Sequence, residues 1–236
     1  MTRTAVQVQD RGVDGLVELR RRRAALLADR RLTWVFGADE PGATVREAWA
    51  GGIRMRIHAP RAAPSSGRPI VLAFHGGGWC WGSPEQSRWM AGRIAVRTGA
   101  VVVVPACRLA PEHPYPAAVE DCWTVLVGLR GPGLGGIVGH YLGRDGSLAE
   151  EWSASPLRAR SHAGLPPALV LTARFDPVRS HAERYAAALR TAGVEVAVHR
   201  PALATHAYLT LPGISPASRA GLARVVTFLR GVLASR

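Results

Sequence analysis

Short continuous runs of apolar residues alternate along the chain with longer segments in which apolar residues recur at helical spacing. Continuous apolar runs are typical of strands buried on both faces, whereas strict alternation indicates a strand buried on one face. On this basis we predict strands over residues 53–57, 70–74, 100–105, 168–172 and 195–199. The helical pattern covers residues 14–31, 83–98, 116–129, 178–192 and a last segment from 215 onward.

The order of these elements indicates the fold class. Strands that alternate with helices through short connections are typical of a mostly parallel sheet with helices on both faces. A chain of 236 residues is long enough for one such α/β domain. We therefore predict a single domain over residues 1–236, in which residues 1–44 form an N-terminal helical cap segment.

Glycine, proline and serine mark several element ends. Residues 32–44 are predicted as a loop because a glycine and a Pro-Gly pair interrupt them. The sequence Ser83-Pro84-Glu85-Gln86 is typical of a helix start, with Ser83 as the N-cap and Gln86 completing a capping box. This helix is expected to end at Gly99.

The chain is strongly basic, with a formal net charge of +13 and a pI near 11.3. Every basic residue is Arg, and both Lys and Asn are absent. Because A-rich codons encode Lys and Asn, a GC-rich genome explains this bias without a nucleic-acid partner. The densest cluster, Arg20 to Arg23, lies in the predicted first helix, where Arg21 to Arg23 fan around the polar side. We expect a solvated helix face, with binding to an anionic surface or to nucleic acid as the alternative.

Apolar runs and cysteines bear on location. No run reaches the ~18 apolar residues that a membrane helix needs. The first twelve residues are polar and lack an apolar signal core. The three cysteines, Cys80, Cys107 and Cys122, are scattered without the spacing of a zinc site or a disulfide framework. We therefore expect a soluble cytoplasmic protein that binds neither membranes nor nucleic acid.

A glycine-rich loop, His75-Gly76-Gly77-Gly78-Trp79, follows the predicted strand 70–74. Glycines without Cβ atoms let backbone N–H groups approach a reacting oxygen. In α/β-hydrolases such a loop supplies the oxyanion hole, and its partner is a serine in a Gly-x-Ser-x-Gly elbow. The chain contains no Gly-x-Ser-x-Gly sequence.

Four stretches resemble the hormone-sensitive-lipase branch of the α/β-hydrolases, the acetyl-esterase-like or fold-3 group. They are the glycine loop, the segment Arg108 to Pro116 (RLAPEHPYP), the segment from Leu165-Pro166-Pro167 to Asp176-Pro177, and His206 in its loop. The match covers most of residues 45–130 and 140–232. The second stretch is long and unusual, which makes a chance resemblance very improbable.

The resemblance implies roles for particular residues. Gly76 and Gly77 would be oxyanion donors, Asp176 the triad acid and His206 the triad base, with no metal or cofactor. Taken alone, Asp176 before Pro177 would favour an interpretation as the N-cap of the following helix. We interpret Arg108, Glu112 and His113 as structural residues that fix their loop by charge pairing.

The chain also departs from the family pattern. The family has a strand, the nucleophile elbow, a helix and a further strand between the segments ending near Leu129 and resuming near His140. Here at least one βαβ unit of roughly 30 residues is missing, together with its serine. A smaller departure is Ala106-Cys107, where the family often has Asp-Tyr. The loss predicts either an open seam, whose exposed edges favour association between copies, or a shift of strand 70–74 towards strand 168–172.

These observations predict a member of the carboxylic-ester hydrolase lineage, acting on short-chain acyl esters or lipase-like substrates, that is inactive or weakly active. One alternative is an active hydrolase with a replacement nucleophile among Ser147, Ser153, Ser155, Ser161, Ser215 and Cys80. Another is a non-catalytic protein that binds an acyl ester or apolar small molecule in the same pocket.

Overall fold

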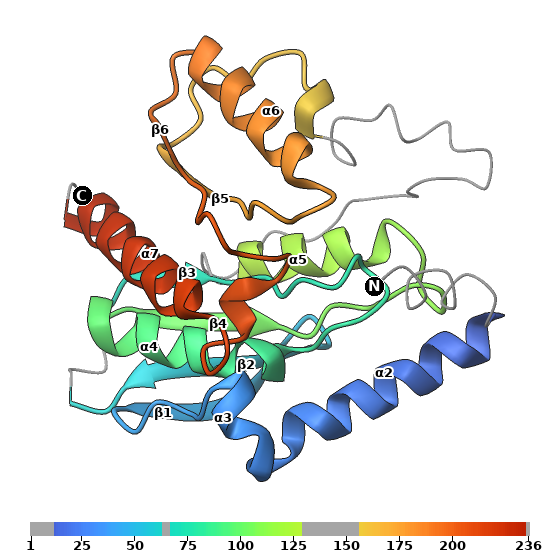
Figure 1. The fold of residues 1–236 in the computed structure, drawn as a ribbon. Helices are drawn as coiled ribbons and strands as arrows, with labels where there is room; N and C mark the ends of the chain where they lie inside the picture. Colours follow the sequence, from blue (N-terminus) through green and yellow to red (C-terminus); the bar gives the residue numbers. More distant parts are fainter. Residues whose placement is uncertain (1–11, 63–66, 129–155, 235–236) are drawn as a thin grey trace. The chain divides into compact units, whose positions relative to one another are not determined.

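The computed structural model describes residues 12–62, 67–128 and 156–234. The chain divides into two compact units, Met1–Tyr141 and Leu142–Arg236, and Figure 1 colours them along the sequence. Each unit contains its own sheet. The expectation of one domain over residues 1–236 stays a prediction.

The first unit holds a four-stranded sheet in the order β1-β2-β4-β3. These strands are β1 (Ala43–Ala50), β2 (Ile53–Pro60), β3 (Ile70–Leu72) and β4 (Val101–Pro105). β2 runs antiparallel to both of its neighbours, β1 and β4, while β3 and β4 are parallel. The predicted α/β class is confirmed, and the sheet is mixed because the N-terminal hairpin adds antiparallel pairs to it.

Strand β1 corrects the sequence analysis, which assigned residues 43 and 44 to a loop and no strand to residues 45–50. Most side chains of β1 are exposed or half-buried, so the strand carries no clear apolar pattern. Its turn is the Gly51-Gly52 pair, in which both residues have positive φ, +56° and +80°. Such a two-residue glycine turn matches the twist of an antiparallel hairpin. The Gly-Gly pair is therefore the feature of the sequence from which β1 could have been predicted.

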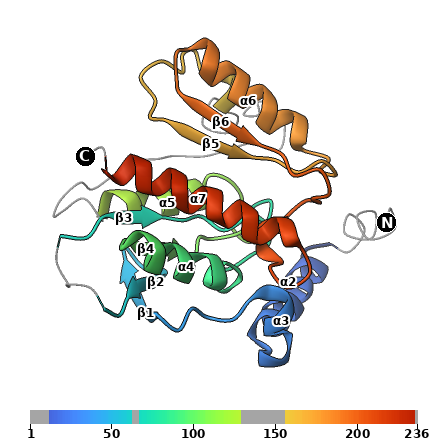
Figure 2. The same ribbon diagram turned by 60° about the vertical axis from the view of Figure 1, so that its left-hand side comes forward.

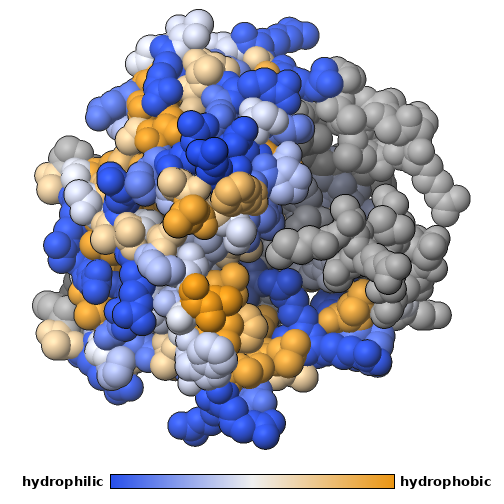
Figure 3. All heavy atoms as spheres, in the orientation of Figure 1, coloured by the Kyte–Doolittle hydropathy of each residue, from blue (hydrophilic) through white to orange (hydrophobic). Residues whose placement is uncertain are grey.

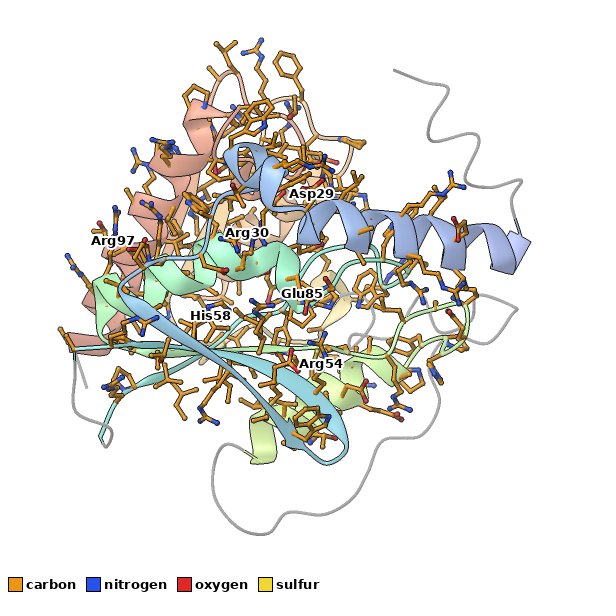
Figure 4. All side chains as sticks on the ribbon, turned by 90° about the horizontal axis from the view of Figure 1, so that it is seen from below. Asp29, Arg30, Arg54, His58, Glu85 and Arg97 are labelled. Atoms are coloured by element: carbon orange, nitrogen blue, oxygen red, sulfur yellow. The ribbon has the colours of Figure 1, made fainter. Side chains whose placement is uncertain are left out.

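The two faces of this sheet are covered by different helices, α4 (Arg88–Thr98) and α5 (Ala117–Gly128) (Figures 1 and 2). Because side chains alternate along a strand, Ile53, Met55 and Ile57 share one face, where they form a buried cluster with Val125 of α5. The intervening residues of β2 lie on the face against which α4 packs. Among them, His58 is only 1% exposed, and Figure 4 shows it between the sheet and α4.

The helix predicted over residues 83–98 begins as the 3-10 turn η2 (Pro84–Ser87) and continues as α4 to its left-handed C-cap, Gly99. The predicted capping box is wrong: the Ser83 side chain makes no capping bond. Gln86 instead donates its side-chain amide to the Gly76 carbonyl at 2.8 Å. The residue assigned to capping therefore supports the glycine loop.

The N-terminal segment contains α2 (Gly12–Ala28), the 3-10 turn η1 (Arg30–Leu32) and α3 (Thr33–Phe36). Arg21, Arg22 and Arg23 are exposed, as expected for a solvated face. Arg20 is different, since its side chain is 23% exposed and pairs with Glu112 at 2.8 Å. It also donates to the carbonyls of Cys80 and Ala110, at 2.9 and 2.7 Å. One arginine thus ties α2 to the segment that follows the glycine loop.

The second unit has a parallel two-stranded sheet of β5 (Ala168–Leu171) and β6 (Val196–His199). The 3-10 turn η4 (Pro156–Arg158) precedes it, and α6 (Arg179–Thr191) connects the strands and packs on them. The 3-10 turn η5 (Tyr208–Thr210) and α7 (Pro216–Ala234) complete the unit. Its core contains Ala173, Ala204 and Tyr208.

Two strands lie at sheet edges where the sequence analysis expected the effect of a lost segment. Within the part of the chain that the structure describes, β3 pairs only with β4, and β5 pairs only with β6. Residues 129–155, where the family's elbow block would be replaced, lie outside the described residues. Whether the seam is open or closed therefore stays a prediction.

Candidate active site

Backbone pairing beyond the ends of β5 and β6 brings residues 176 and 206 together. Phe175 and Thr205 form an isolated parallel bridge just past the two strands. The Phe175 N–H donates to the Ala204 carbonyl at 3.0 Å, and the His206 N–H donates to the Phe175 carbonyl at 3.1 Å. The residues that follow these bonds, Asp176 and His206, therefore emerge side by side although they are far apart in sequence.

The side chains of Asp176 and His206 are hydrogen-bonded. Asp176 Oδ2 lies 3.0 Å from His206 Nδ1. The carboxylate is 14% exposed, whereas the imidazole is 65% exposed. With Nδ1–H donating to the carboxylate, Nε2 carries the lone pair and acts as the acceptor. This is the arrangement of an acid and a general base, and it leaves Nε2 directed away from its orienting partner.

Asp176 has a second bond that the sequence analysis treated as an alternative role. Its Oδ1 accepts the backbone N–H of Val178 at 2.8 Å, which satisfies a donor at the start of the turn leading into α6. One carboxylate thus caps this turn with one oxygen and orients His206 with the other. Val178 is the N-cap of α6, so the N-cap interpretation of Asp176 is wrong, although Asp176 does accept a bond in the turn before the helix.

The glycine loop lies in the first unit and follows β3. Gly77 has φ +144°, and a Cβ on it would overlap the Trp81 carbonyl. The Gly77 carbonyl accepts the N–H groups of Cys80 and Trp81, at 3.2 and 3.0 Å. Within the described residues, the N–H groups of Gly76 and Gly77 donate to no backbone carbonyl. The turn therefore uses a carbonyl group as its acceptor, and the N–H groups of the two predicted oxyanion donors stay free of backbone hydrogen bonds with the described residues.

Contacts from three other segments hold this loop in place. Gln86 and Arg20 bind the carbonyls of Gly76 and Cys80, and the Ala110 N–H donates to the Trp79 carbonyl at 2.8 Å. Burial lowers the pKa of His75, so its imidazole is neutral near pH 7. A loop fixed from several sides is suited to presenting preorganised N–H donors.

A cavity of about 280 Å³ opens beside the loop, entirely within the first unit. The glycines form one wall, and the remainder includes Trp81, Leu109, Cys107 and Cys122. The lining is mostly apolar. Such a lining suits a small acyl group whose carbonyl oxygen faces the loop.

The charged residues of the RLAPEHPYP segment pair with residues of two helices. Arg108 donates to Asp121 at 2.9 Å and to Glu120 at 3.1 Å, and both acceptors belong to α5. Glu112 pairs with Arg20 of α2, as described above. Arg108 and Glu112 form charge pairs as predicted, with partners on two helices that spacing in the sequence does not indicate. For His113, the bond found among the described residues is one of its backbone, from its N–H to the Leu109 carbonyl at 3.0 Å.

Several replacement nucleophiles were considered in the sequence analysis. Ser147, Ser153 and Ser155 lie outside the described residues. Ser161 accepts the Ala163 N–H at 3.1 Å in an exposed turn. Ser215 directly precedes α7, and its N–H donates to the Leu211 carbonyl at 2.9 Å. Cys80 is a half-buried free thiol beside the glycine loop.

The sequence analysis missed four residues that shape the cavity or hold the loop. Arg20 and Gln86 bind loop carbonyls, and Cys107 and Cys122 line the cavity. Only Cys107 carried a signal, because it replaces a residue type that the family pattern favours. The other three act through contacts between segments that are distant in sequence.

Comparison with known proteins agrees with this architecture. A family model described as the alpha/beta hydrolase fold matches residues 71–133 and 134–210. Esterase LipI of Mycobacterium tuberculosis is 30% identical over 78% of this chain and 79% of its own length. The carboxylesterase NlhH of the same species is 27% identical over 77% of this chain and 79% of its own length.

Solved structures give the same result. The carboxylesterase EstE1, cloned from a metagenomic library, is 26% identical with a TM-score of 0.75, covering 92% of this chain and 97% of its own. A thermostable esterase from Pseudomonas putida is 25% identical with a TM-score of 0.73, covering 91% and 89%. Since the family model spans more than half of the sequence, the chain belongs to the α/β-hydrolase fold family, in its hormone-sensitive-lipase or acetyl-esterase-like branch.

Proposed function

We propose that this protein belongs to the carboxylic-ester hydrolase lineage and that its ester turnover is absent or weak. The proposal rests on the absence of a Gly-x-Ser-x-Gly serine. The chain nevertheless keeps a hydrogen-bonded Asp176–His206 pair and a glycine loop whose Gly76 and Gly77 N–H groups donate to no backbone carbonyl within the described residues. A general base and an oxyanion hole lower the barrier for acyl transfer only when a nucleophile lies between them. The substrate class of the lineage is a short-chain or lipase-like acyl ester.

The alignment with Esterase LipI supports a missing internal segment. It runs over 254 residues although it draws on 78% of this 236-residue chain. That share of the chain is shorter than the alignment, so stretches of the relative have no counterpart here. The edge positions of β3 and β5 are consistent with a block lost between the two sheets.

The test is intact-mass spectrometry after treatment with a fluorophosphonate, on wild-type protein and on His206→Ala. We expect no adduct on either protein and ester hydrolysis at the level of the buffer. His181→Ala is the matched control, because His181 is an exposed histidine on α6, and a cooperative melt establishes that each protein is folded. A stoichiometric adduct that disappears in His206→Ala but persists in His181→Ala would establish a replacement nucleophile and overturn the proposal.

A second candidate function is small-molecule binding without hydrolysis, favoured by the mostly apolar cavity beside the glycine loop. A ketone analogue of a short-chain ester, such as 2-heptanone, should then raise the melting temperature in a concentration-dependent manner. Leu109→Trp, which places a larger side chain in the cavity wall, should abolish that shift. An identical shift in the variant would assign the ligand to another place.

The proposal also covers where in the cell the protein is found and how copies of the chain associate. None of the described helices is long and apolar enough to span a membrane. On the face shown in Figure 3, hydrophobic residues lie in small groups between hydrophilic ones. All three cysteines are free thiols, which suits the reducing cytoplasm. The exposed edges of β3 and β5 are the surfaces through which copies of the chain would associate.

A further inference from the structure

Two cysteines meet in the wall of the cavity beside the glycine loop. Cys107 follows β4 and Cys122 lies in α5, and their Sγ atoms are 3.2 Å apart. Both residues line the cavity together with Gly76, Gly77 and Gly78. The contact joins residues separated by fifteen positions, so the tertiary fold creates it.

Residues adjacent to the two cysteines in sequence form hydrogen bonds that hold them in this position. Arg108, next to Cys107, donates its backbone N–H to Asp121 at 2.6 Å and its Nε to the same carboxylate at 2.9 Å. Asp121 is next to Cys122 in sequence and is only 3% exposed. On the other side, the Ala106 N–H donates to the Arg54 carbonyl at 2.8 Å. These bonds hold the two chain segments next to each other, so the two sulfurs are kept in contact.

The two thiols are chemically unequal. The hydrogen bond with Cys122 lowers the pKa of Cys107 and outweighs the opposing effects of burial and of the Asp121 carboxylate. The same hydrogen bond, together with burial, raises the pKa of Cys122. Cys107 is therefore the thiol that ionises first, and Cys122 stabilises its thiolate by donating a proton to the hydrogen bond.

We propose that Cys107 and Cys122 are a redox-active dithiol that a peroxide converts to an intramolecular disulfide in the cavity wall. The Cys107 sulfur attacks one peroxide oxygen, the O–O bond breaks, and the departing oxygen leaves as water with the thiol proton. The Cys122 sulfur then attacks the sulfenic acid, the S–O bond breaks, and a second water leaves with the Cys122 proton. Two thiols lose two electrons and one hydrogen peroxide gains them.

The distance and the location suit this reaction. Disulfide sulfurs are about 2.0 Å apart, so the 3.2 Å contact must close by roughly 1 Å. The new bond would join the segment after β4 to α5 directly beside the glycine loop. Disulfides in cytoplasmic proteins are mostly transient and redox-sensing. Oxidation would thereby reshape the cavity in response to peroxide, whether or not the protein hydrolyses esters.

The tryptic map makes the test direct, because each cysteine lies in a separate peptide. Cys107 lies in 98–108, Cys122 in 109–130 and Cys80 in 62–88. After hydrogen peroxide treatment of the whole protein, non-reducing digestion should link 98–108 to 109–130. Titration with a thiol reagent should fall from three free thiols to one, and a reductant should restore all three.

Variants separate the pair from a general sensitivity to peroxide. Cys80→Ser should form the linked peptide as the wild type does, while Cys107→Ser and Cys122→Ser should not. In unoxidised protein, pulsed alkylation should label Cys107 before Cys122, a readout that requires no variant to fold. A linked peptide that contains Cys80, or over-oxidation of Cys107 with Cys122 still free, would overturn the proposal.

Discussion

At the scale of single residues, Asp176 combines two functions in one carboxylate. One oxygen accepts the Val178 N–H, and the other faces His206 Nδ1. The same residue therefore supports the local turn and the pair predicted to act as acid and base. Substitutions that remove charge, or charge and bonding capacity together, distinguish the two functions.

For this reason we expect Asp176→Asn and Asp176→Ala to differ in stability. The Asn amide oxygen can still accept the Val178 N–H, so its free energy of unfolding should stay within about 0.5 kcal/mol of wild type. Ala loses the bond and should be destabilised by about 1 kcal/mol. Urea unfolding measures both values, and equal destabilisation of the two variants would show that the cap bond contributes nothing.

His58 offers a second prediction at this scale. Burial between the sheet and α4, with a smaller effect of Arg56, lowers its pKa from 6.5 to about 4. The folded protein therefore holds neutral His58, while the unfolded chain takes up a proton below pH 6.5. Stability should be full above that pH and should fall as the pH decreases towards 4, by up to about 3 kcal/mol.

The measurement is the free energy of unfolding across this pH range for wild type, His58→Leu and the exposed-site control His181→Leu. The His58 variant should lose most of this pH dependence, and the control should keep it. An unchanged slope in His58→Leu would assign the acid sensitivity to other groups.

At the scale of elements, two neighbouring glycines of the glycine loop have positive φ, but only one of them also lacks space for a Cβ atom. Gly77 has positive φ and no room for a Cβ, because the Trp81 carbonyl occupies that space. Gly78 also has positive φ, +57°, but has nothing within 4 Å of its Cβ position. The two positions therefore form a matched pair.

We expect Gly78→Ala to cost about 1 kcal/mol, the penalty of placing a non-glycine residue in a left-handed conformation. Gly77→Ala should cost clearly more, about 2–3 kcal/mol, because the loop must also move away from the clash. Thermal or urea unfolding measures both. If the two variants were equally stable, the Gly77 turn would not have the geometry described here.

At the scale of the whole molecule, the open edges of β3 and β5 lead to a prediction about assembly. Unpaired edge strands associate, and a charged side chain on an edge opposes this. Ile70 is 48% exposed on β3, and Val45 is 40% exposed on the other edge strand of that sheet, β1.

We therefore expect concentration-dependent association of the wild type in sedimentation experiments, with a shift towards monomer in Ile70→Lys. Val45→Lys places the same charge on the other edge strand, β1, so a shift confined to Ile70→Lys assigns the association to the β3 edge. A wild type that stays monomeric throughout the concentration series would rule out this edge as an association surface.

The local elements and the family could be predicted from the order of residues in the chain. Apolar runs and helical periodicity depend on residues that are neighbours in the chain, so they predicted the strand cores and the main helices closely. The glycine loop, Asp176, His206 and the missing serine were all identifiable as motifs. Among the described elements, β1 was missed because an exposed edge strand has no apolar pattern to detect, and the four-residue helix α3 was missed within a segment predicted as a loop.

Contacts between residues that are distant in the chain became known from the folded structure. The bond between Asp176 and His206 depends on the parallel pairing that continues past β5 and β6. The contact of Cys107 with Cys122 depends on how α5 packs beside the end of β4. Such contacts are set by register and packing across the fold, and no local pattern encodes them, because the interacting residues become neighbours only when the chain is folded.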